Sequence, residues 1–398
     1  MQIQVSQKEV YITRTSVNYN LVMFVLACCA FFVVCNVYTM LPIIEELSMV
    51  FAVPGSDIGW VTSSFTLFYS IGFLLFGPLS DRWGRWQVIV YGLAALSVST
   101  LILFAIEDFN HLIFFRGLQG FFAATFAPAA LTYVFEVFPP EKRGLTIVYI
   151  SAGFSISGIM GQIFSSWITK LLDWNYVFLF FFVVYLVLFV LAWIHLPKGP
   201  KSKENADSVP FRIQVMKVLG NPNLIKGYLI ALTLFFCFVG MYSSFGGYLT
   251  RAYGLDTMEI LWIRLIGIIG IMFSFFTGRM VKKYGLKQVL IIGLLTAAIG
   301  LAMEGATSNL TFIIISTVIF VSGFSIVIPI MIQVIGTIGQ KHRSIAVTIY
   351  SFILFLGASI GPLMLRIPDF NTVCFILAGV LGGAVLLSFM IKFPNETN

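Results

Sequence analysis

Residues 77–85 read GPLSDRWGR, and residues 278–285 read GRMVKKYG. Each segment follows a long apolar stretch and has a second glycine, Gly84 or Gly285, seven residues after its first. A second pair repeats at nearly the same separation, because Glu141-Lys142-Arg143 and Lys341-His342-Arg343 each open another apolar stretch. Motifs that recur at matching places in both halves indicate that the chain is a duplicated unit.

The apolar stretches around these motifs are long enough to cross a membrane. A spanning helix needs roughly 20 apolar residues. Twelve such stretches lie near 21–44, 58–79, 87–106, 109–137, 145–169, 174–196, 224–249, 257–280, 286–305, 309–338, 345–366 and 371–391. They do not alternate apolar and polar residues as spanning β-strands do. We therefore expect an all-α membrane protein with twelve transmembrane helices in two pseudo-symmetric six-helix halves.

The composition excludes most other classes of protein. Of the 398 residues, 59% are hydrophobic and only 10% are charged, whereas a soluble domain carries about 25% charged residues. A soluble enzyme, a nucleic-acid-binding protein and a disordered chain are excluded on these grounds. The five cysteines lie in apolar stretches without metal-ligand spacing, which favours packing roles. We expect no enzymatic activity, no cofactor and no metal site.

The basic residues predict the orientation in the membrane. Most of them fall in loops on one side when both termini are placed in the cytoplasm. The net charge of +7 is then a topology signal. The first apolar stretch is long enough to span, so we expect no cleaved signal peptide. We expect a multi-pass protein of the cell membrane, inner or plasma.

A polar and basic segment divides the chain. Residues 198–221 are punctuated by proline and glycine and predict a cytoplasmic linker. The halves are then residues 1–197 and 222–398. Within the linker, the sequence FRIQVMKVL predicts a short interfacial amphipathic helix.

Two arginines lie inside predicted spans, at similar depth from the outer side. Arg116 is in the fourth stretch, where it shares a helical face with Gln119, and Arg264 is in the eighth. An arginine within a membrane costs at least ~2.5 kcal/mol on insertion scales and is a functional candidate. For Arg116 a structural ion pair or carbonyl contact is the alternative, and for Arg264 it is snorkelling to the interface.

The acids of the spans lie near their outer ends, so the midplane potential is predicted to be positive. An arginine fork binds a carboxylate bidentately, which favours an anionic or zwitterionic substrate. Candidate substrate-binding residues are the polar side chains of the spans: Arg116, Gln119, Arg264, Asn36, Tyr242 and Gln333, with Tyr38, Tyr69, Gln162 and Ser243 as weaker members. Candidate proton-coupling residues are Glu45, Glu46 and Glu304.

The segment 77–85 has a chemistry of its own. Gly77 and Gly84 permit tight turning, and Asp81 can face a helix N-terminus. Arg82 or Arg85 can pair with the carboxylate of Glu136, which ends the fourth span. The alternative is that the two arginines only anchor the loop on the cytoplasmic side.

These residues resemble the major facilitator superfamily over essentially the whole chain. GPLSDRWGR matches the loop signature G-x-L-x-D-R-x-G-R, and residues 116–120 match the R-x-x-Q-G signature of the twelve-span drug:proton antiporter branch. Leu41-Pro42 and Glu136-Val-Phe-Pro139 are similar to the same branch. The antiporter signature of the fifth span, Gly-Pro followed closely by Gly-Gly, is not matched, because residues 153–162 read GFSISGIMGQ.

The resemblance implies the major facilitator fold, alternating access, and a latch that stabilises the outward-facing state. The implied latch residues are Gly77, Asp81, Arg82, Gly84, Arg85, Glu136 and Arg143. No phosphate-binding G-x-x-x-x-G-K loop is present. We therefore expect a secondary active transporter that is coupled to protons.

We expect export of a small anionic or zwitterionic metabolite, for example a carboxylate-rich metal chelator. A broad multidrug efflux pump and a lipid-handling flippase on the same fold remain open alternatives, and fold alone does not fix the direction of transport. The expected partners are the small-molecule substrate, protons and membrane lipid, with no nucleic acid, and the expected state is a monomer.

Overall fold

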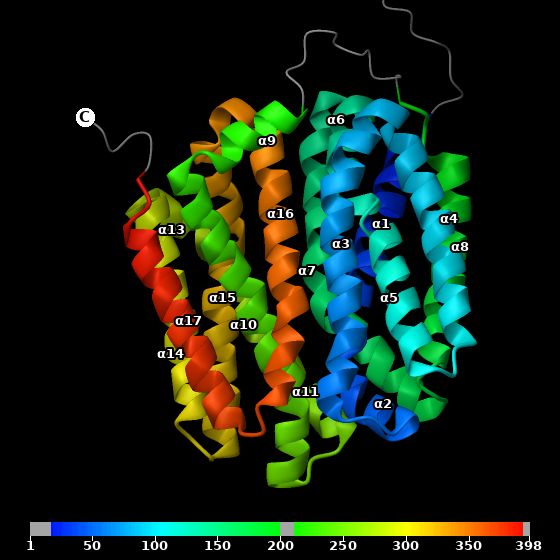
Figure 1. The fold of residues 1–398 in the computed structure, drawn as a ribbon. Helices are drawn as coiled ribbons and strands as arrows, with labels where there is room; N and C mark the ends of the chain where they lie inside the picture. Colours follow the sequence, from blue (N-terminus) through cyan, green and yellow to red (C-terminus); the bar gives the residue numbers. More distant parts are fainter. Residues whose placement is uncertain (1–16, 200–210, 393–398) are drawn as a thin grey trace, which may run out of the picture.

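The computed structural model describes residues 17–199 and 211–392 (Figure 1). It contains twelve helices, some of them broken, that are long and apolar enough to cross a membrane, and no strand within these residues. The predicted all-α fold with twelve spans is confirmed. Residues 1–16, residues 200–210 of the predicted linker and residues 393–398 lie outside the described residues.

The first six spans are built from eight α-helices and one 3-10 helix. Their bounds are α1 Tyr19–Tyr38, η1 Leu41–Ile43, α2 Ile44–Phe51, α3 Gly55–Trp83, α4 Arg85–Phe104, α5 Phe109–Ala123, α6 Phe126–Val137, α7 Pro140–Leu171 and α8 Tyr176–His195. A short helix, α9 Phe211–Leu219, follows at the place where the sequence predicted one.

The other six spans contain more breaks. Their bounds are α10 Pro222–Tyr253, α11 Thr257–Ile266, α12 Ile268–Met272, η2 Phe273–Phe276, α13 Thr277–Tyr284, α14 Leu286–Gly305, α15 Leu310–Ile338, η3 Gln340–His342, α16 Arg343–Ile360, η4 Gly361–Arg366 and α17 Phe370–Phe389.

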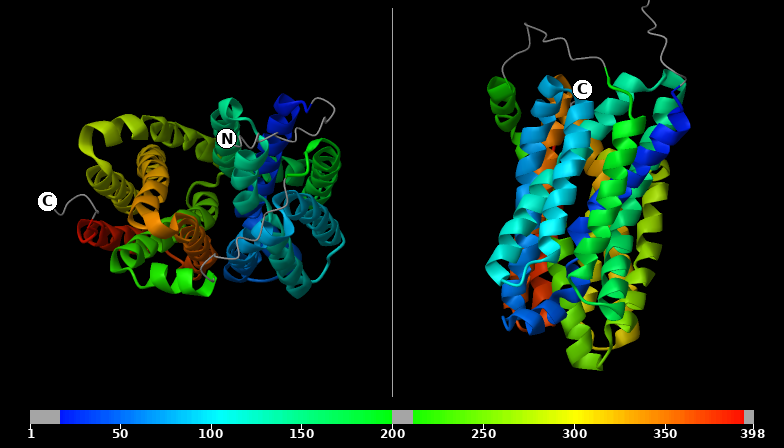
Figure 2. Two further views of the ribbon diagram at one scale, coloured as in Figure 1. Left: turned by 90° about the horizontal axis from the view of Figure 1, so that it is seen from above. Right: turned by 90° about the vertical axis from the view of Figure 1, so that its right-hand side faces the viewer.

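The helices pack around separate apolar cores. One large core joins buried side chains of α1 and α3 to α8, another joins those of α9 to α11 and α14 to α17, and a smaller one includes those of α2. Figures 1 and 2 show the two groups side by side, with α9 lying across one end of the molecule. We call this the α9 end and the opposite one the distal end. Leu41 of η1 belongs to the second core, so the groups are joined by apolar packing near the distal end.

Four spans are interrupted, where the sequence predicted continuous helices. Pro42 lies at the break between α1 and α2, Gly267 separates α11 from α12, and Pro362 lies in η4. The fourth span breaks between α5 and α6. Irregular backbone at membrane depth is stable only where protein or water satisfies its polar groups. Ser325 of α15, for example, donates its hydroxyl to the carbonyl oxygen of Gly270 in α12 at 2.9 Å.

Aspartate or asparagine side chains begin four helices at the distal end. These caps are Asp108 of α5, Asp256 of α11, Asn309 of α15 and Asp369 of α17. The backbone N–H of His111 donates to Asp108, which lowers the pKa of that carboxyl. The side chain and backbone of Thr372 both donate to Asp369 and lower its pKa as well. The caps satisfy amides that the helix itself leaves unpaired.

Close contacts join the two helix groups at the distal end and at mid-height. A Cβ on Gly59 of α3 would lie 3.0 Å from Cβ of Pro362 in η4. Further along α3, the rings of Tyr69 and Phe73 lie 4.7 and 5.5 Å from the ring of Phe355 in α16. The two groups are therefore closely packed at the distal end.

Candidate functional site

Arg264 lies at the boundary between the two helix groups. Its Nη1 donates to Oε1 of Gln162 in α7 at 2.9 Å, and its Nη2 donates to the carbonyl oxygen of Tyr242 in α10 at 3.3 Å. The side chain is 4% exposed, and the guanidinium carbon lies 5.9 Å from the centroid of the Tyr242 ring. Arg264 thus connects α11 with the other half of the molecule and with its own half at the same time.

Small residues create the space for this guanidinium. A Cβ on Gly246 of α10 would lie 3.0 Å from Nη2 of Arg264. At the break that follows α11, a Cβ on Gly267 would lie 3.0 Å from the Arg264 carbonyl oxygen and 3.1 Å from the Tyr242 hydroxyl. The position of Arg264 therefore depends on close backbone approach as well as on hydrogen bonds.

Arg116 is fully buried inside the first helix group. Its Nη1 donates to Oε1 of Gln119 at 2.5 Å and to Oδ1 of Asn36 at 3.3 Å, and its Nη2 donates to the Asn36 carbonyl oxygen at 3.2 Å. The guanidinium carbon lies 4.4 Å from the ring centroid of Phe65. Every one of these partners belongs to α1, α3 or α5, so Arg116 does not face Arg264 across the boundary.

The amides around Arg116 are held in turn by hydroxyl groups. Nδ2 of Asn36 donates to the hydroxyl oxygen of Tyr185 in α8 at 2.5 Å. Nε2 of Gln119 donates to Oγ1 of Thr100 in α4 at 2.8 Å. The result is a buried polar network that joins α1, α4, α5 and α8.

Among the residues that the structure describes, both arginines have only neutral hydrogen-bond acceptors. Within residues 17–199 and 211–392, the ion pairs found involve Asp81, Arg85, Glu136, Asp108 and His111, so neither Arg116 nor Arg264 is paired with a carboxylate. The Nε–H of each arginine is also buried without a partner in this part of the chain. Two guanidinium groups that are hydrogen-bonded but not neutralised give the interior a positive potential.

The remaining predicted substrate and proton residues are spread over several places. Tyr242 is buried beside Arg264, whereas Gln333 is exposed on α15. The exposed Glu45 of α2 packs against Gly247 of α10, and the half-buried Glu46 lies on the same helix. Glu304 of α14 is fully buried.

The predicted latch residues are largely together at the α9 end. Nη2 of Arg85 lies 2.6 Å from Oδ1 of Asp81, and Nη1 of Arg85 forms an ion pair with Glu136 of α6. Between α3 and α4, Gly84 has a φ of 99°, which favours glycine. Arg82 is exposed. The structure therefore brings Asp81, Arg85 and Glu136 into one cluster.

Two predicted latch residues lie beside this cluster. Nε of Arg143 donates to the carbonyl oxygen of Phe138 at 2.9 Å, which ties the start of α7 to the end of α6. Gly77 of α3 faces α16, where a Cβ would lie 3.8 Å from Thr348. A side chain would fit at Gly77, which lies within α3, so the tight turn predicted for both glycines is present only at Gly84.

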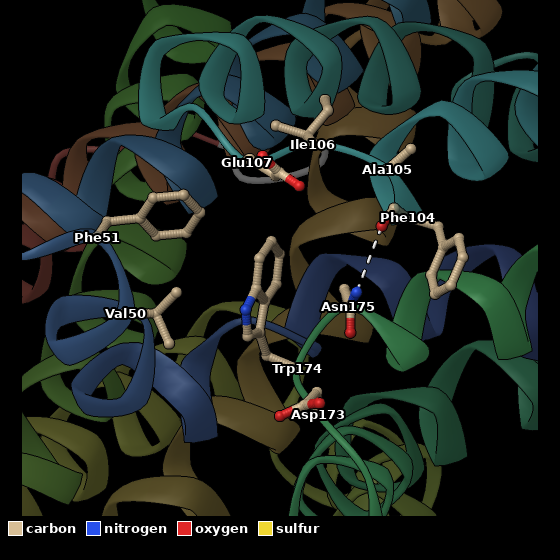
Figure 3. Close-up of a pocket in the computed structure, with 9 residues that line it drawn as sticks. All are labelled: Val50, Phe51, Phe104, Ala105, Ile106, Glu107, Asp173, Trp174 and Asn175. Atoms are coloured by element: carbon tan, nitrogen blue, oxygen red, sulfur yellow. Dashed lines mark hydrogen bonds between the residues drawn. The ribbon is translucent and has the colours of Figure 1, made fainter.

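A separate pocket of about 310 Å³ opens at the distal end of the first helix group (Figure 3). Its lining residues are Val50, Phe51, Phe104, Ala105, Ile106, Glu107, Asp173, Trp174 and Asn175. None of the predicted site residues lines it. Because both charged residues in the lining are acids, this pocket does not suit the anionic substrate that the arginines suggest.

Three partners of the buried polar groups could not be predicted from the sequence: Tyr185, Thr100 and Thr317. The hydroxyl of Thr317 in α15 contacts Glu304. The hydroxyls of Tyr185 and Thr100 accept hydrogen bonds from the amides that surround Arg116. Tyr185 is the one clear sequence signal among them, because its hydroxyl interrupts a long apolar run in α8. Threonines in spanning helices usually return a hydrogen bond to their own helix, so Thr100 and Thr317 gave no distinctive pattern.

Comparison with known sequences places the chain among transporters. It is 24% identical over 354 residues to YybF of Bacillus subtilis, an uncharacterized MFS-type transporter, with 88% of this chain and 87% of YybF covered. It is also 34% identical over 119 residues to multidrug resistance protein 3 of Bacillus subtilis, a match that covers 30% of this chain and 23% of that protein.

Solved structures share the fold. A bacterial homologue of the human lysosomal transporter Spinster, in an inward-facing and occupied conformation, matches with a TM-score of 0.76 at 15% identity, covering 95% of this chain and 97% of that one. The human organic anion transporter MFSD10 matches with a TM-score of 0.71 at 16% identity, covering 94% and 100%. The Major Facilitator Superfamily profile matches residues 26–362 and 261–397. This chain therefore belongs to the Major Facilitator Superfamily, as a multi-pass membrane protein with the fold of a secondary transporter.

Proposed function

We propose that the protein exports a small anionic or zwitterionic metabolite by alternating access, coupled to protons. The observation that carries this proposal is the pair of buried arginines with neutral partners only. Burying a guanidinium without a counter-charge is unfavourable, so a substrate carboxylate would be stabilised in the same region. Arg264 is the proposed direct ligand, and Arg116 the residue that maintains the local potential and fixes Asn36.

The contact between Arg264 and Gln162 suggests how substrate binding and closure are related. The two residues belong to α11 and α7, which lie in different helix groups. If the groups separate at the distal end, Nη1 of Arg264 loses its acceptor. A carboxylate can then accept from the planar fork of the guanidinium through two hydrogen bonds. In this account, substrate and Gln162 compete for the same donor.

The orientation and the coupling are part of the same proposal. We propose that the α9 end is cytoplasmic and that the distal end faces the outside of the cell, because most basic loop residues lie toward the α9 end. The sequence contains no phosphate-binding loop, so we propose the proton gradient as the source of energy. A protonophore should therefore abolish export, whereas ATP depletion at a clamped gradient should not. Transport that is indifferent to the proton gradient would contradict the coupling.

Multidrug efflux is the second candidate. It is supported by the relative named multidrug resistance protein 3 and by Arg116-Gly-Leu-Gln119-Gly120 in α5. Against it, the buried charged groups beside the boundary include Arg264, whereas a carrier of cations usually places an acid at mid-membrane. The fold match to a protein named as an organic anion transporter agrees with the first candidate.

Comparative metabolomics of medium and cytosol tests the proposed function. Cells that lack the protein are compared with cells that express the wild type or Arg264→Lys at equal levels in the membrane. We expect a carboxylate-bearing metabolite to be retained in the cytosol of the first and third strains and exported by the second. Retention of lipophilic cations alone would replace this function by multidrug efflux, and retention of a lipid would replace it by lipid handling.

A further inference from the structure

Glu304 is a fully buried carboxylate near the distal end of α14. Its Oε1 lies 3.0 Å from Oγ1 of Thr317, whose single hydroxyl proton is shared between Oε1 and the carbonyl oxygen of Ile313 at 2.9 Å. Its Oε2 has no hydrogen-bond partner in the part of the chain that the structure describes. A carboxylate with one donor and no counter-ion is strongly disfavoured as an anion in such surroundings, and binding a proton removes the charge.

The packing around Glu304 explains why it is dry. The next residue, Gly305, allows α17 to approach closely, since a Cβ there would lie 3.0 Å from both the Asn371 carbonyl oxygen and Cβ of Cys374. The ionisable groups that face Glu304 are Tyr242 from α10 and Cys374 from α17, and Thr317 faces it from α15. None of the three carries a positive charge.

Tyr242 links this carboxylate to the boundary between the helix groups. Its phenol lies within electrostatic range of both Glu304 and Arg264. The Tyr242 carbonyl oxygen accepts from Arg264, which also donates to Gln162 of α7. A series of polar side chains therefore extends from the interior of the second helix group to the first: Glu304, Tyr242, Arg264 and Gln162.

We propose that Glu304 is a proton-binding site and that its charge controls the contact between Arg264 and Gln162. This inference rests on the proposed proton coupling and names the residue responsible for it. When Glu304 is neutral, Arg264 has only neutral acceptors and holds Gln162, which keeps the distal end closed. When Glu304 loses its proton, the anion attracts Arg264 towards the second helix group, and the contact with Gln162 weakens.

The sign of this effect agrees with exchange of substrate for protons. A proton that binds Glu304 from the distal side favours closure there and returns the transporter to its inward-facing form. Release of the proton favours opening at the distal end, where the substrate leaves. Glu45 and Glu46 fit this role less well, because Glu45 is exposed and Glu46 is half-buried. Water can solvate their charges, so their protonation is not tied to the contact between the groups.

The test measures the separation of α7 and α11 at the distal end as pH changes. Spin labels are placed on Leu172→Cys and Thr257→Cys, two exposed sites, in protein whose five native cysteines are replaced by alanine. The distance distribution is then recorded in lipid nanodiscs between about pH 5.5 and about pH 8.5. In the otherwise wild-type protein, the ratio of long to short distances should rise about tenfold over this range.

Variants identify the responsible group. Glu304→Gln should stay at the short distance with less than about a twofold change, because it remains neutral. Glu107→Gln, an exposed acid at the distal end of the first helix group, is the matched control and should respond like the wild type. Thr317→Val removes the donor to the charged form of Glu304, so the transition should move to higher pH.

The outcomes separate this inference from the proposed function. If Glu304→Gln keeps the full pH response, another group binds the proton and this inference is wrong, while proton coupling stands. If the wild type shows no response, both are wrong. Should Glu304→Gln fail to reach the membrane, Thr317→Val decides, and an unchanged transition pH in that variant would overturn the proposal.

Discussion

Arg116 and Arg264 are the same residue type at similar depth in the chain's two halves, yet their surroundings give them different roles. The partners of Arg116 are all inside one helix group, whereas Arg264 donates to Gln162 across the boundary. The alternative of a structural carbonyl contact applies in part to Arg116, which binds the Asn36 carbonyl oxygen. Only Arg264 can change partners when the two groups move apart.

Replacement of Arg264 by lysine should impair transport almost as much as replacement by alanine. Lysine keeps the charge but cannot donate to Gln162 and Tyr242 with one planar group. We expect the initial rate of substrate transport to fall at least about tenfold in both variants. Arg251→Lys, an exposed site on α10, is the control and should transport normally. A normal rate in Arg264→Lys would show that the fork geometry is not used.

Arg116→Ala should act mainly on stability. The substitution leaves the acceptors of Asn36 and Gln119 buried without their donor and removes a large buried side chain. We expect a loss of about 1–3 kcal/mol in the free energy of unfolding. Thermal unfolding of the purified protein measures this, with Arg264→Ala expected to be less affected. Equal unfolding temperatures for wild type and Arg116→Ala would remove the structural role.

At the scale of elements, two corresponding loops share an unusual backbone conformation. Gly84 and Gly285, which end the repeated motifs, have φ values of 99° and 84°. Alanine at either position should cost about 1–3 kcal/mol of stability, because this region of φ and ψ is almost restricted to glycine. Gly285→Ala isolates the backbone effect, since no other atom lies within 4 Å of its Cβ position.

A helical glycine provides the control for this pair. Gly382 of α17 also has open space at its Cβ position, but its backbone is helical. Gly382→Ala should leave stability unchanged or raise it slightly. If all three alanine variants unfold at the same temperature as the wild type, the positive φ at Gly84 and Gly285 does not require glycine, and this prediction is wrong.

The cluster of Asp81, Arg85 and Glu136 joins α3 and α4 to α6 at the α9 end. We expect Asp81→Asn and Arg85→Ala to abolish transport while insertion into the membrane remains normal. The side chain of Asp81 is exposed and its ion pair contributes little to stability, so the effect of Asp81→Asn should be on the conformational equilibrium rather than on folding. Transport into vesicles at matched protein level measures it. Near-normal rates in both variants would leave Arg85 as a simple positive anchor.

The twelve spans could be predicted from the sequence, whereas the breaks within four of them could not. Long apolar runs must be helical in lipid, so the twelve spans followed from length alone. The breaks at Gly267 and at Gly361-Pro362 depend on contacts with neighbouring helices, as with Ser325 and Gly270. Partners such as Thr317 for Glu304 were also beyond reach, because they result from which faces of two helices meet.

In the whole molecule, the proposed alternating access depends on the boundary between the two helix groups. The groups have separate apolar cores and meet through Arg264 and Gln162, Glu45 and Gly247, and the packing of α3 on α16. Groups with their own cores can move as rigid bodies, which is what alternating access requires. The polar contacts at the distal end are those that such a movement must break.

We propose that the interior selects a carboxylate through Arg264. The most direct measurement is the unfolding temperature of purified protein titrated with citrate, glutamate and tetraphenylphosphonium, with sulfate at equal ionic strength as the control for salt effects. Ligand that binds the folded state stabilises it in proportion to ln(1 + [L]/Kd). We predict that one or both carboxylates raise the unfolding temperature of the wild type above the sulfate control and not that of Arg264→Lys. Stabilisation of the wild type by tetraphenylphosphonium, with neither carboxylate active, would contradict the claim.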